Sequence, residues 1–306
     1  MRVSMTGSAG FIGSALTKEL IKQGHYVRSC DVIPKKANPQ FEYFFQGDFT
    51  DEKTCENLVK GTDVCVHMGA VANLNWARQH PSETININVL GTAKVAEACG
   101  KYQIPMLYIS TCCCYGETNI HPTPEHGAEM NPTEIYGCNK YAGEQVVKGI
   151  SSLNNGFPYR ILRYSTVYGP GMREALATYI FSEKALTGKP LPIHGTGMQT
   201  RSFVYIDDLV YATMQAIQKP LKNDIINIAG SENLSVLDIA HTCLDIAGIP
   251  RRQHAAHLNF VTDRPGQVMK EWILIKEAEK TLHWKPQTKF KYGMTIAMNW
   301  VKKRVG

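Results

Sequence analysis

The chain has 306 residues, of which 43% are hydrophobic and 20% charged, and its formal net charge is +6. These values are ordinary for a soluble globular protein and allow a large core with two lobes. Because the basic residues are scattered, the charge suits a small polyanionic ligand, and we expect no nucleic-acid partner. No apolar run reaches about 18 residues, so we expect no membrane partner either.

The nine cysteines are an odd number and do not have the paired spacing of a disulfide framework. The first residues lead directly into an apolar stretch at residues 3–5, which is typical of a strand and not of a cleavable leader. From both features we expect a reducing compartment and a cytoplasmic protein.

A glycine-rich turn separates the first expected strand, residues 2–5, from the first expected helix, which Gly24 ends. Glycines allow the backbone to turn tightly and to approach a pyrophosphate, whose charge is stabilised by the N-terminus of the helix. The residues of this turn that we expect to contact a dinucleotide are Gly7, Gly10, Phe11, Ile12 and Gly13.

An acidic residue follows the second expected strand, residues 26–30. Asp31 lies 18 residues beyond Gly13 (31 minus 13), where a carboxylate accepts hydrogen bonds from both hydroxyls of an adenosine ribose. The same carboxylate repels a 2'-phosphate. We therefore expect NAD and not NADP, although Lys35 and Lys36 are basic residues nearby.

Strands and helices continue to alternate along the chain. Further strands are expected at residues 41–46, 63–68, 106–110, 160–164 and 224–229. Further helices are expected at residues 53–60, 85–102, 136–148, 176–187, 207–218, 237–247, 276–282 and 292–302. This alternation predicts an α/β fold: a Rossmann-type doubly wound parallel sheet, with ligands at the carboxyl ends of its strands.

A smaller C-terminal substrate-binding lobe is indicated by the glycine, proline and β-forming residues of 188–205. We expect the strand at 224–229 to return to the large sheet. The expected NAD-binding Rossmann domain is residues 1–168 and 204–229. The expected substrate-binding lobe is residues 169–203 and 230–306.

Several residues follow expected strands directly and therefore lie near the expected cofactor. Asp48 either binds the adenine amino group or caps a turn. Gly69 and Ala70 are small enough for the chain to pass close to the cofactor. His67 is expected to pack beside the cofactor and not to act in catalysis.

The strongest signal for chemistry is a tyrosine and a lysine four residues apart. If residues 136–148 are helical, Tyr136 and Lys140 lie on one helix face. A tyrosine acts as a base near neutral pH only if its pKa of about 10 falls by about 3 units, which requires about 4 kcal/mol. The charge of Lys140 and a cationic cofactor ring are the expected sources of this stabilisation.

Taken together, these features resemble the extended short-chain dehydrogenase/reductases, in particular the NAD-dependent nucleotide-sugar epimerases and dehydratases that are similar to UDP-glucose 4-epimerase. The resemblance covers nearly the whole chain. It rests on Gly7, Gly10, Gly13, Asp31 and Asp48 and on residues 88–92, 110–116, 136–140, 163–169, 195–208 and 264–266. It implies a permanently bound NAD, a nucleotide-sugar substrate, most simply a UDP-sugar, and a homodimer. The dimer would form a four-helix bundle from residues 85–102 and 136–148 of each subunit.

The resemblance also implies roles for single residues. Tyr136 would remove the proton from a sugar hydroxyl while the adjacent carbon passes hydride to NAD, giving a 4-keto sugar. Thr111 would share the hydrogen bond of that hydroxyl, and Lys140 would bind the nicotinamide ribose and keep Tyr136 anionic. The further residues implied to contact NAD are Phe49, Met68, Gly69, Ala70, Asn88, Ser110 and Tyr164.

Two arginines and a threonine are implied to contact the substrate. Arg201 and Arg264 occupy positions where the family binds the nucleotide diphosphate, and a guanidinium group fits phosphate oxygens bidentately. Thr166 stands where an asparagine usually contacts the substrate. Gln267 stands where the family often has an aspartate.

The chemistry after oxidation separates the branches of the family. An epimerase returns hydride to the other face of the rotated keto sugar and needs no further acid or base. A 4,6-dehydratase needs an acid and a base directly after the catalytic threonine, where this chain has Cys112, Cys113 and Cys114. We therefore expect a UDP-sugar 4-epimerase.

Two alternatives remain open. Ser110, Thr111 and Cys112 resemble the tunicamycin-pathway dehydratase, which makes a 5,6-unsaturated UDP-N-acetylglucosamine, and Cys112 and Cys113 would then be the acid and base. The other interpretation of these cysteines is packing as small apolar residues. A metal site is not expected, because consecutive strand residues point to opposite faces. The remote alternative is a non-catalytic NAD-binding sensor, although such proteins usually lose the tyrosine and lysine.

Overall fold

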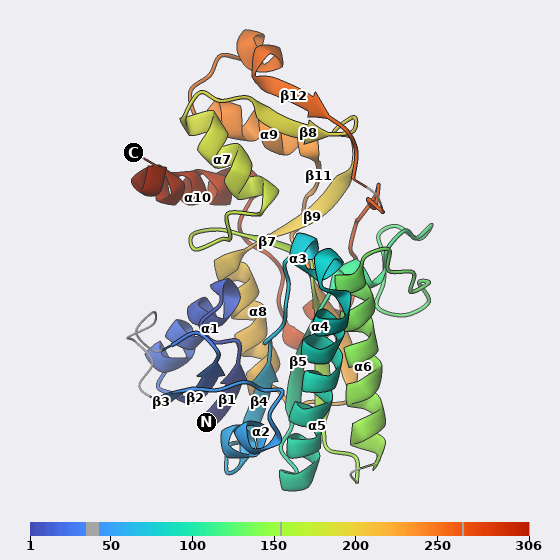
Figure 1. Cartoon of the computed structure of the whole chain (residues 1–306). Coiled ribbons are helices and arrows are strands. Elements are labelled where there is room, and N and C mark those ends of the chain that lie inside the picture. Colours follow the sequence, from blue (N-terminus) through green and yellow to red (C-terminus); the bar gives the residue numbers. More distant parts are fainter. Residues whose placement is uncertain (35–42, 154, 265, 306) are drawn as a thin grey trace.

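The computed structural model describes residues 1–34, 43–153, 155–264 and 266–305 (Figure 1). Its largest sheet has seven parallel strands in the order β10-β6-β5-β4-β1-β2-β3. They are β1 (Arg2–Thr6), β2 (Tyr26–Asp31), β3 (Tyr43–Gln46), β4 (Val64–His67), β5 (Met106–Thr111), β6 (Tyr159–Tyr164) and β10 (Asp224–Ile228). This topology confirms the predicted doubly wound sheet. Lys35, Lys36, Pro265 and the first two residues of the strand expected at 41–46 lie outside the described residues.

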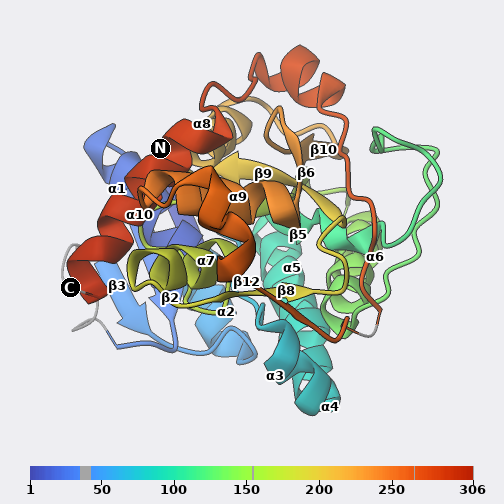
Figure 2. The same cartoon turned by 90° about the horizontal axis from the view of Figure 1, so that it is seen from above.

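Helices cover both faces of the large sheet, and the central strands are therefore buried throughout. All four residues of β4 and all six of β5 are buried, as expected for strands with helices on both sides. One face packs against α1 (Phe11–Lys22) and α8 (Ile206–Gln218), which lie together. The other face packs against α2 (Glu52–Val59), α5 (Gly91–Tyr102) and α6 (Ile135–Leu153), with α5 and α6 side by side (Figures 1 and 2).

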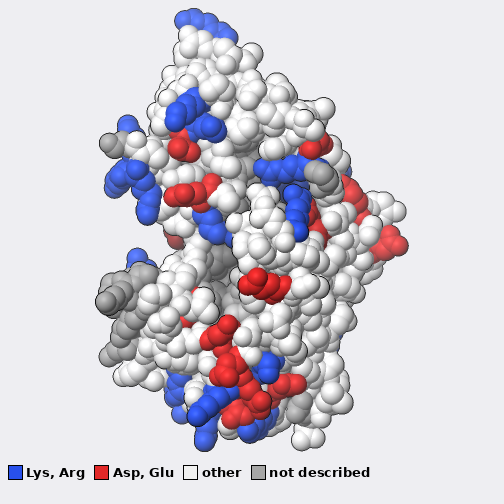
Figure 3. Space-filling model, viewed as in Figure 1, with Lys and Arg blue, Asp and Glu red and all other residues white. Residues whose placement is uncertain are grey.

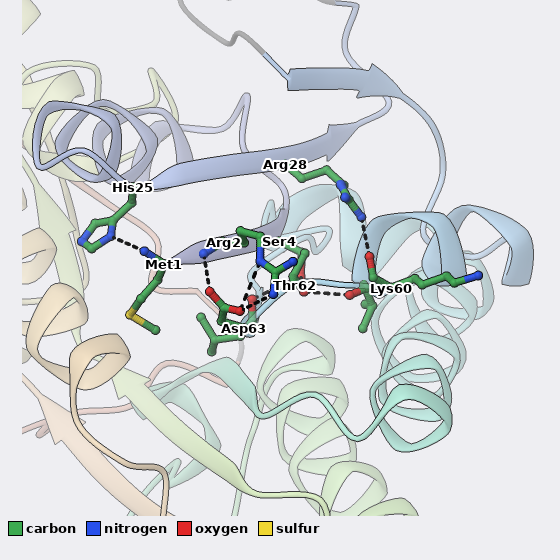
Figure 4. Close-up of polar contacts among 10 residues, drawn as sticks. Met1, Arg2, Ser4, His25, Arg28, Lys60, Thr62 and Asp63 are labelled. Atoms are coloured by element: carbon green, nitrogen blue, oxygen red, sulfur yellow. Dashed lines mark hydrogen bonds and ion pairs between the residues drawn. The ribbon is translucent and has the colours of Figure 1, made fainter.

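Polar contacts hold the edge of the sheet at the amino end of β1 (Figure 4). The backbone N–H of Arg2 donates to one carboxylate oxygen of Asp63 at 2.7 Å, and its guanidinium donates to the other at 2.8 Å. The hydroxyls of Ser4 and Thr62 lie 3.1 Å apart and share a hydrogen bond. These contacts fix the start of β1 beside the segment that enters β4, at the end of the sheet away from the carboxyl ends of the strands.

The stretch between β4 and α5 is largely helical, although no helix was expected there before residue 85. It forms α3 (Leu74–Gln79) and α4 (Pro81–Ile85), and a π-helical turn, η2 (Asn86–Leu90), then leads into α5. Two local signals start these helices. Asn73 caps α3 by accepting hydrogen bonds from two backbone N–H groups, and proline is favoured in the first turn of α4.

The smaller lobe lies above the carboxyl ends of the large sheet in Figure 1. Its strands form two small sheets, β11 (Asn233–Ser235), β9 (Thr200–Tyr205) and β7 (Thr166–Tyr168) in one, and β12 (Leu258–Val261) and β8 (Leu191–His194) in the other. Its helices are α7 (Ala177–Leu186), α9 (Val236–Ile246), the 3-10 helix η4 (Arg251–His257) and α10 (Phe290–Val305). The π-helical turn η5 (Ala278–Leu282) lies beside α8 and β10 of the large lobe. One hydrophobic core runs through both lobes. The domain boundaries given above stay a prediction.

The surface is mixed in charge on the face shown in Figure 3, where lysines and arginines form separate groups among acidic residues. Among the helices of the described residues, none has both the length and the apolar character needed to cross a membrane.

Candidate active site

The glycine turn after β1 lies against the loop that follows β4. Gly7 has a φ of +70°, and a Cβ atom there would lie 2.8 Å from the Cα of Gly69. At Gly13 a Cβ atom would lie 2.1 Å from the carbonyl oxygen of Gly7. Both positions therefore require glycine. The hydroxyl of Ser8 in this turn is buried and has no hydrogen-bond partner among the described residues, which leaves a polar oxygen for a bound cofactor.

Asp31 lies where a ribose-binding carboxylate is expected. One of its oxygens accepts a hydrogen bond from the backbone N–H of Ala9 in the glycine turn at 2.9 Å, and the other accepts one from Ile33 at 3.1 Å. These bonds hold the carboxylate at the end of β2, beside the glycine turn. The two features that predicted NAD from the sequence are therefore neighbours in the structure.

Asp48 and Phe49 follow β3, and their side chains contact other parts of the protein, which favours packing over direct binding of a cofactor. Asp48 accepts a hydrogen bond from the backbone N–H of Thr50 at 2.8 Å, so it caps a turn; its contact with adenine stays a prediction. The ring of Phe49 packs edge-on against His67 with 5.1 Å between centroids, and it fills the space beside Gly69.

Asn88 holds the loop after β4 in place. Its side-chain oxygen accepts from the backbone N–H of Val71 at 2.8 Å, and its amide group donates to the carbonyl of Val71 at 3.0 Å. The side chain is buried. Asn88 therefore positions the segment that contains Gly69 and Ala70, next to the glycine turn.

His67 is held between two threonines. Its Nδ1 lies 2.7 Å from the hydroxyl of Thr6, and its Nε2 lies 3.0 Å from the hydroxyl of Thr92. The Thr92 hydroxyl donates to the carbonyl of Asn88, so it accepts the proton of His67 Nε2. Burial lowers the pKa of His67 well below its usual value. A neutral, fully hydrogen-bonded ring agrees with the packing role.

Tyr136 and Lys140 lie one turn apart at the start of α6. Lys140 is only 2% exposed, and burial lowers its pKa to about 7. Burial also raises the pKa of Tyr136, and the neighbouring Cys113 raises it further. The protein groups around Tyr136 therefore raise its pKa and do not by themselves make it a base; that a cationic nicotinamide ring lowers this pKa stays a prediction.

The end of β5 brings Thr111 and the cysteines against the start of α6. The hydroxyl of Thr111 accepts from the backbone N–H of Cys113 at 3.2 Å and caps the 3-10 helix η3 (Cys112–Cys114). A Cβ atom on Gly137 would lie 2.6 Å from the carbonyl oxygen of Cys113. This close approach places Cys113 next to Tyr136, and Thr111 is two residues before Cys113 at the end of β5.

The cysteines of η3 are not activated as thiolates. Cys112 is 2% exposed, and its thiol donates to the carbonyl oxygen of Arg163. Burial raises the pKa of Cys112 well above its usual value and that of Cys113 to about 11. The raised pKa values of both thiols favour packing over acid and base chemistry.

A buried ion pair behind the site was missed from the sequence. Arg163 in β6 donates to both carboxylate oxygens of Glu144 in α6 at 2.9 and 2.6 Å, and Ser110 donates to the same carboxylate at 2.6 Å. The available signals were Glu144 four residues after Lys140 and an arginine inside an apolar strand. The hydroxyl of Ser110 is thus occupied, and only its backbone remains for NAD.

The hydroxyl of Tyr164, like that of Ser110, is hydrogen-bonded within the protein. Its hydroxyl lies 2.6 Å from that of Thr213 in α8, and the side chain is buried. A contact between Tyr164 and NAD would therefore involve atoms other than this hydroxyl.

The expected substrate residues of the smaller lobe meet in one cavity of about 220 Å³. Thr166 of β7, Arg201 of β9 and Arg264 all line it, together with Gln267. Burial lowers the pKa of Arg264; the charges of Arg78 and Arg201 lower it further, and those of Glu134 and Asp263 oppose this. Two guanidinium groups at one cavity suit a diphosphate. Thr111 does not line this cavity and lies at the end of β5.

The parallel sheet, the glycine turn with its acidic partner, and the tyrosine and lysine on α6 define a dinucleotide-dependent α/β enzyme. Residues 3–229 match the model of the NAD dependent epimerase/dehydratase family, and the chain belongs to that family. This confirms the resemblance, the enzyme class and NAD as the cofactor. The described residues contain no group of three or more metal-binding side chains that could hold a metal ion.

Three similar proteins illustrate the family. A putative UDP-glucose 4-epimerase of Methanocaldococcus jannaschii is 34% identical, and the match covers 98% of both chains. The UDP-glucose 4-epimerase of Thermotoga maritima, solved with UDP-glucose, superposes with a TM-score of 0.92 at 27% identity over 100% of both chains. A UDP-glucuronic acid 4-epimerase mutant of Bacillus cereus, solved with UDP-4-deoxy-4-fluoro-glucuronic acid and NAD, gives 0.90 at 29% identity over 99% of this chain and 100% of the other.

Proposed function

We propose that the chain is an NAD-dependent UDP-sugar 4-epimerase that works through a transient 4-keto sugar. The observation that carries this proposal is the end of β5, where Thr111 caps the helical turn that packs against the start of α6, but the two residues after it are thiols with raised pKa values. Oxidation at C4 needs Thr111 and Tyr136. Dehydration also needs an acid and a base directly after Thr111, at the positions of Cys112 and Cys113.

Bound NAD supplies the hydride acceptor and donor. Tyr136 removes the proton of the sugar 4-hydroxyl and returns it after the keto sugar has rotated, and Thr111 shares the hydrogen bond. Lys140 binds the nicotinamide ribose. Arg201 and Arg264 bind the diphosphate in the cavity of the smaller lobe and leave the sugar next to Tyr136.

The residues of the glycine turn fit NAD. Gly7 and Gly13 allow the close approach that a pyrophosphate needs, and the unpartnered hydroxyl of Ser8 is in the same turn. Asp31 is positioned for the adenosine ribose. These residues support the proposal that the cofactor-binding set of the sequence analysis holds NAD in this chain.

We also propose a homodimer formed by α5 and α6 of each subunit. The two helices lie side by side on the outside of the sheet (Figure 2), and the helical run that leads into α5 exposes Ile85 and Leu90 at 45% and 52%. A monomer at micromolar concentration in light scattering would refute this.

The location we propose is the cytoplasm, because all nine cysteines, each in the described part of the chain, are free thiols.

The test is proton NMR with mass spectrometry on UDP-glucose, UDP-galactose and their N-acetyl forms, incubated with the purified protein in deuterated water. An isomer of unchanged mass, without deuterium in the sugar, is the expected result. A product lighter by one water would establish a dehydratase and make Cys112 and Cys113 the acid and base. Absence of turnover on every nucleotide sugar would favour the NAD-binding sensor.

A further inference from the structure

Glu271 is a carboxylate that the sequence analysis did not place at the active site. Its backbone N–H donates to the carbonyl oxygen of Thr200 at 3.1 Å, so the residue lies alongside β9, directly beside Arg201. The side-chain amide of Asn233 in β11 donates to the backbone oxygen of Glu271 at 2.5 Å. The backbone is therefore held on both sides, and the position of the side chain is determined by the smaller lobe.

The carboxylate of Glu271 is poorly satisfied by the protein. The backbone N–H of Ser202 donates to it, whereas Oε1 is buried and has no hydrogen-bond partner among the described residues. Burial raises the pKa of Glu271, and the charge of Arg201 opposes this. A buried carboxylate oxygen without a partner destabilises the fold, so its presence at this point calls for a functional explanation.

We define the proposed sugar subsite as the space between Arg201 and Tyr136. The carboxylate of Glu271 interacts electrostatically with groups at both ends of this subsite. Burial and, after it, the Glu271 carboxylate raise the pKa of Cys112 and of Cys113. Cys113 in turn lies close enough to Tyr136 to raise its pKa. The carboxylate thus lies between Arg201, at the diphosphate end of the subsite, and Cys113, which is close to Tyr136 at the catalytic end.

We propose that Glu271 is a specificity residue that disfavours sugars carrying their own carboxylate, so that the enzyme selects neutral UDP-hexoses over UDP-uronates. This inference rests on the proposed function, because Arg201 and Tyr136 define the sugar subsite. Glucose, galactose and their N-acetyl forms bring only neutral groups next to Glu271. A uronate brings a second negative charge into a partly buried site, and a like charge within about 6 Å corresponds to about a tenfold or larger loss of affinity.

The experiment compares two ligands that differ in this charge. Isothermal titration of the NAD-containing protein with UDP-glucose and with UDP-glucuronate gives a ratio of dissociation constants for the wild type, for Glu271→Gln and for Glu279→Gln. Glu271→Gln keeps the size of the side chain and removes the charge. Glu279→Gln removes an exposed carboxylate farther along the same segment and is the matched control.

We expect the wild type and Glu279→Gln to bind UDP-glucuronate at least tenfold more weakly than UDP-glucose, and Glu271→Gln to reduce that ratio about tenfold. Equal affinity of the wild type for both ligands would overturn the inference, as would an unchanged ratio in Glu271→Gln. The wild-type comparison keeps the test valid if the variant does not fold. Binding without turnover would instead contradict the proposed function while leaving the selectivity measurable.

Discussion

The ammonium nitrogen of Lys140 lies 4.1 Å from the centroid of the Tyr108 ring. The hydroxyl of Tyr108 donates to the backbone oxygen of Lys140 at 3.3 Å, so the ring is fixed against the first turns of α6. A cation over an aromatic face is stabilised, but burial has the larger effect and lowers the pKa of Lys140 to about 7, opposed by Glu144. The NAD-free protein therefore contains a lysine that loses its proton near neutral pH.

The lowered pKa of Lys140 predicts a pH dependence of stability. An ordinary lysine has a pKa of 10.5, whereas Lys140 in the folded protein has a pKa of about 7. Between these values the unfolded state binds more protons, so the free energy of unfolding rises with pH, with a slope of up to about 1.4 kcal/mol per pH unit. Urea unfolding of NAD-free protein from pH 7 to 10 should show this rise, and Lys140→Met should lack it. Identical slopes in both proteins would contradict the assignment.

Tyr136→Phe should remove turnover and leave NAD bound. The variant loses the only atom of this side chain that can accept the proton of the sugar, and general-base catalysis contributes about 10²- to 10⁴-fold. Tyr141→Phe, later on the same helix, is a suitable control. The measurement is the epimerisation rate followed by NMR, together with the NAD content of each protein. Full activity of Tyr136→Phe would refute Tyr136 as the base.

Glu144→Gln should destabilise the fold strongly. The change leaves the guanidinium of Arg163, whose side chain is 3% exposed, without its buried carboxylate, and breaking such a pair costs about 3–5 kcal/mol. Glu56→Gln is the matched control, because the ion pair of Glu56 with Lys101 is far more exposed and should cost at most about 1 kcal/mol. Denaturant titrations measure both. A similar decrease in the free energy of unfolding of the two variants would show that burial does not determine how much an ion pair stabilises the fold.

Arg264→Ala should weaken binding of UDP by about 10- to 100-fold, since one charged hydrogen-bonding group contributes about 1.5–3 kcal/mol. Arg252→Ala changes an exposed arginine of η4 and should leave the affinity unchanged. Calorimetric titration with UDP alone separates this contact from any contact with the sugar. Equal affinity of Arg264→Ala and wild type would remove Arg264 from the diphosphate site.

Features that depend on short spacings have the geometry expected from the sequence, whereas their roles in binding and catalysis stay predictions. The glycine turn, Asp31 at the next strand end and the pair of Tyr136 and Lys140 are defined within about 20 residues each, and backbone geometry converts such spacings into positions. The helices α3 and α4 were not among the expected helices, although Asn73 and Pro81, which start them, are local signals.

Local patterns in the sequence were enough to predict the fold class, the family, the cofactor and the candidate base, because periodicity and glycine spacing act through backbone geometry. Which distant side chains meet became clear from the tertiary structure alone. It brought Thr166, Arg201 and Arg264 into one cavity, paired Arg163 with Glu144, and set Glu271 close to Cys113, which is 158 positions away (271 minus 113). Contacts between residues so far apart in the sequence depend on how the lobes pack, and spacing along the chain does not predict them. The same packing sets the pKa values, since burial shifts those of Tyr136 and Lys140 in directions that their spacing alone does not predict.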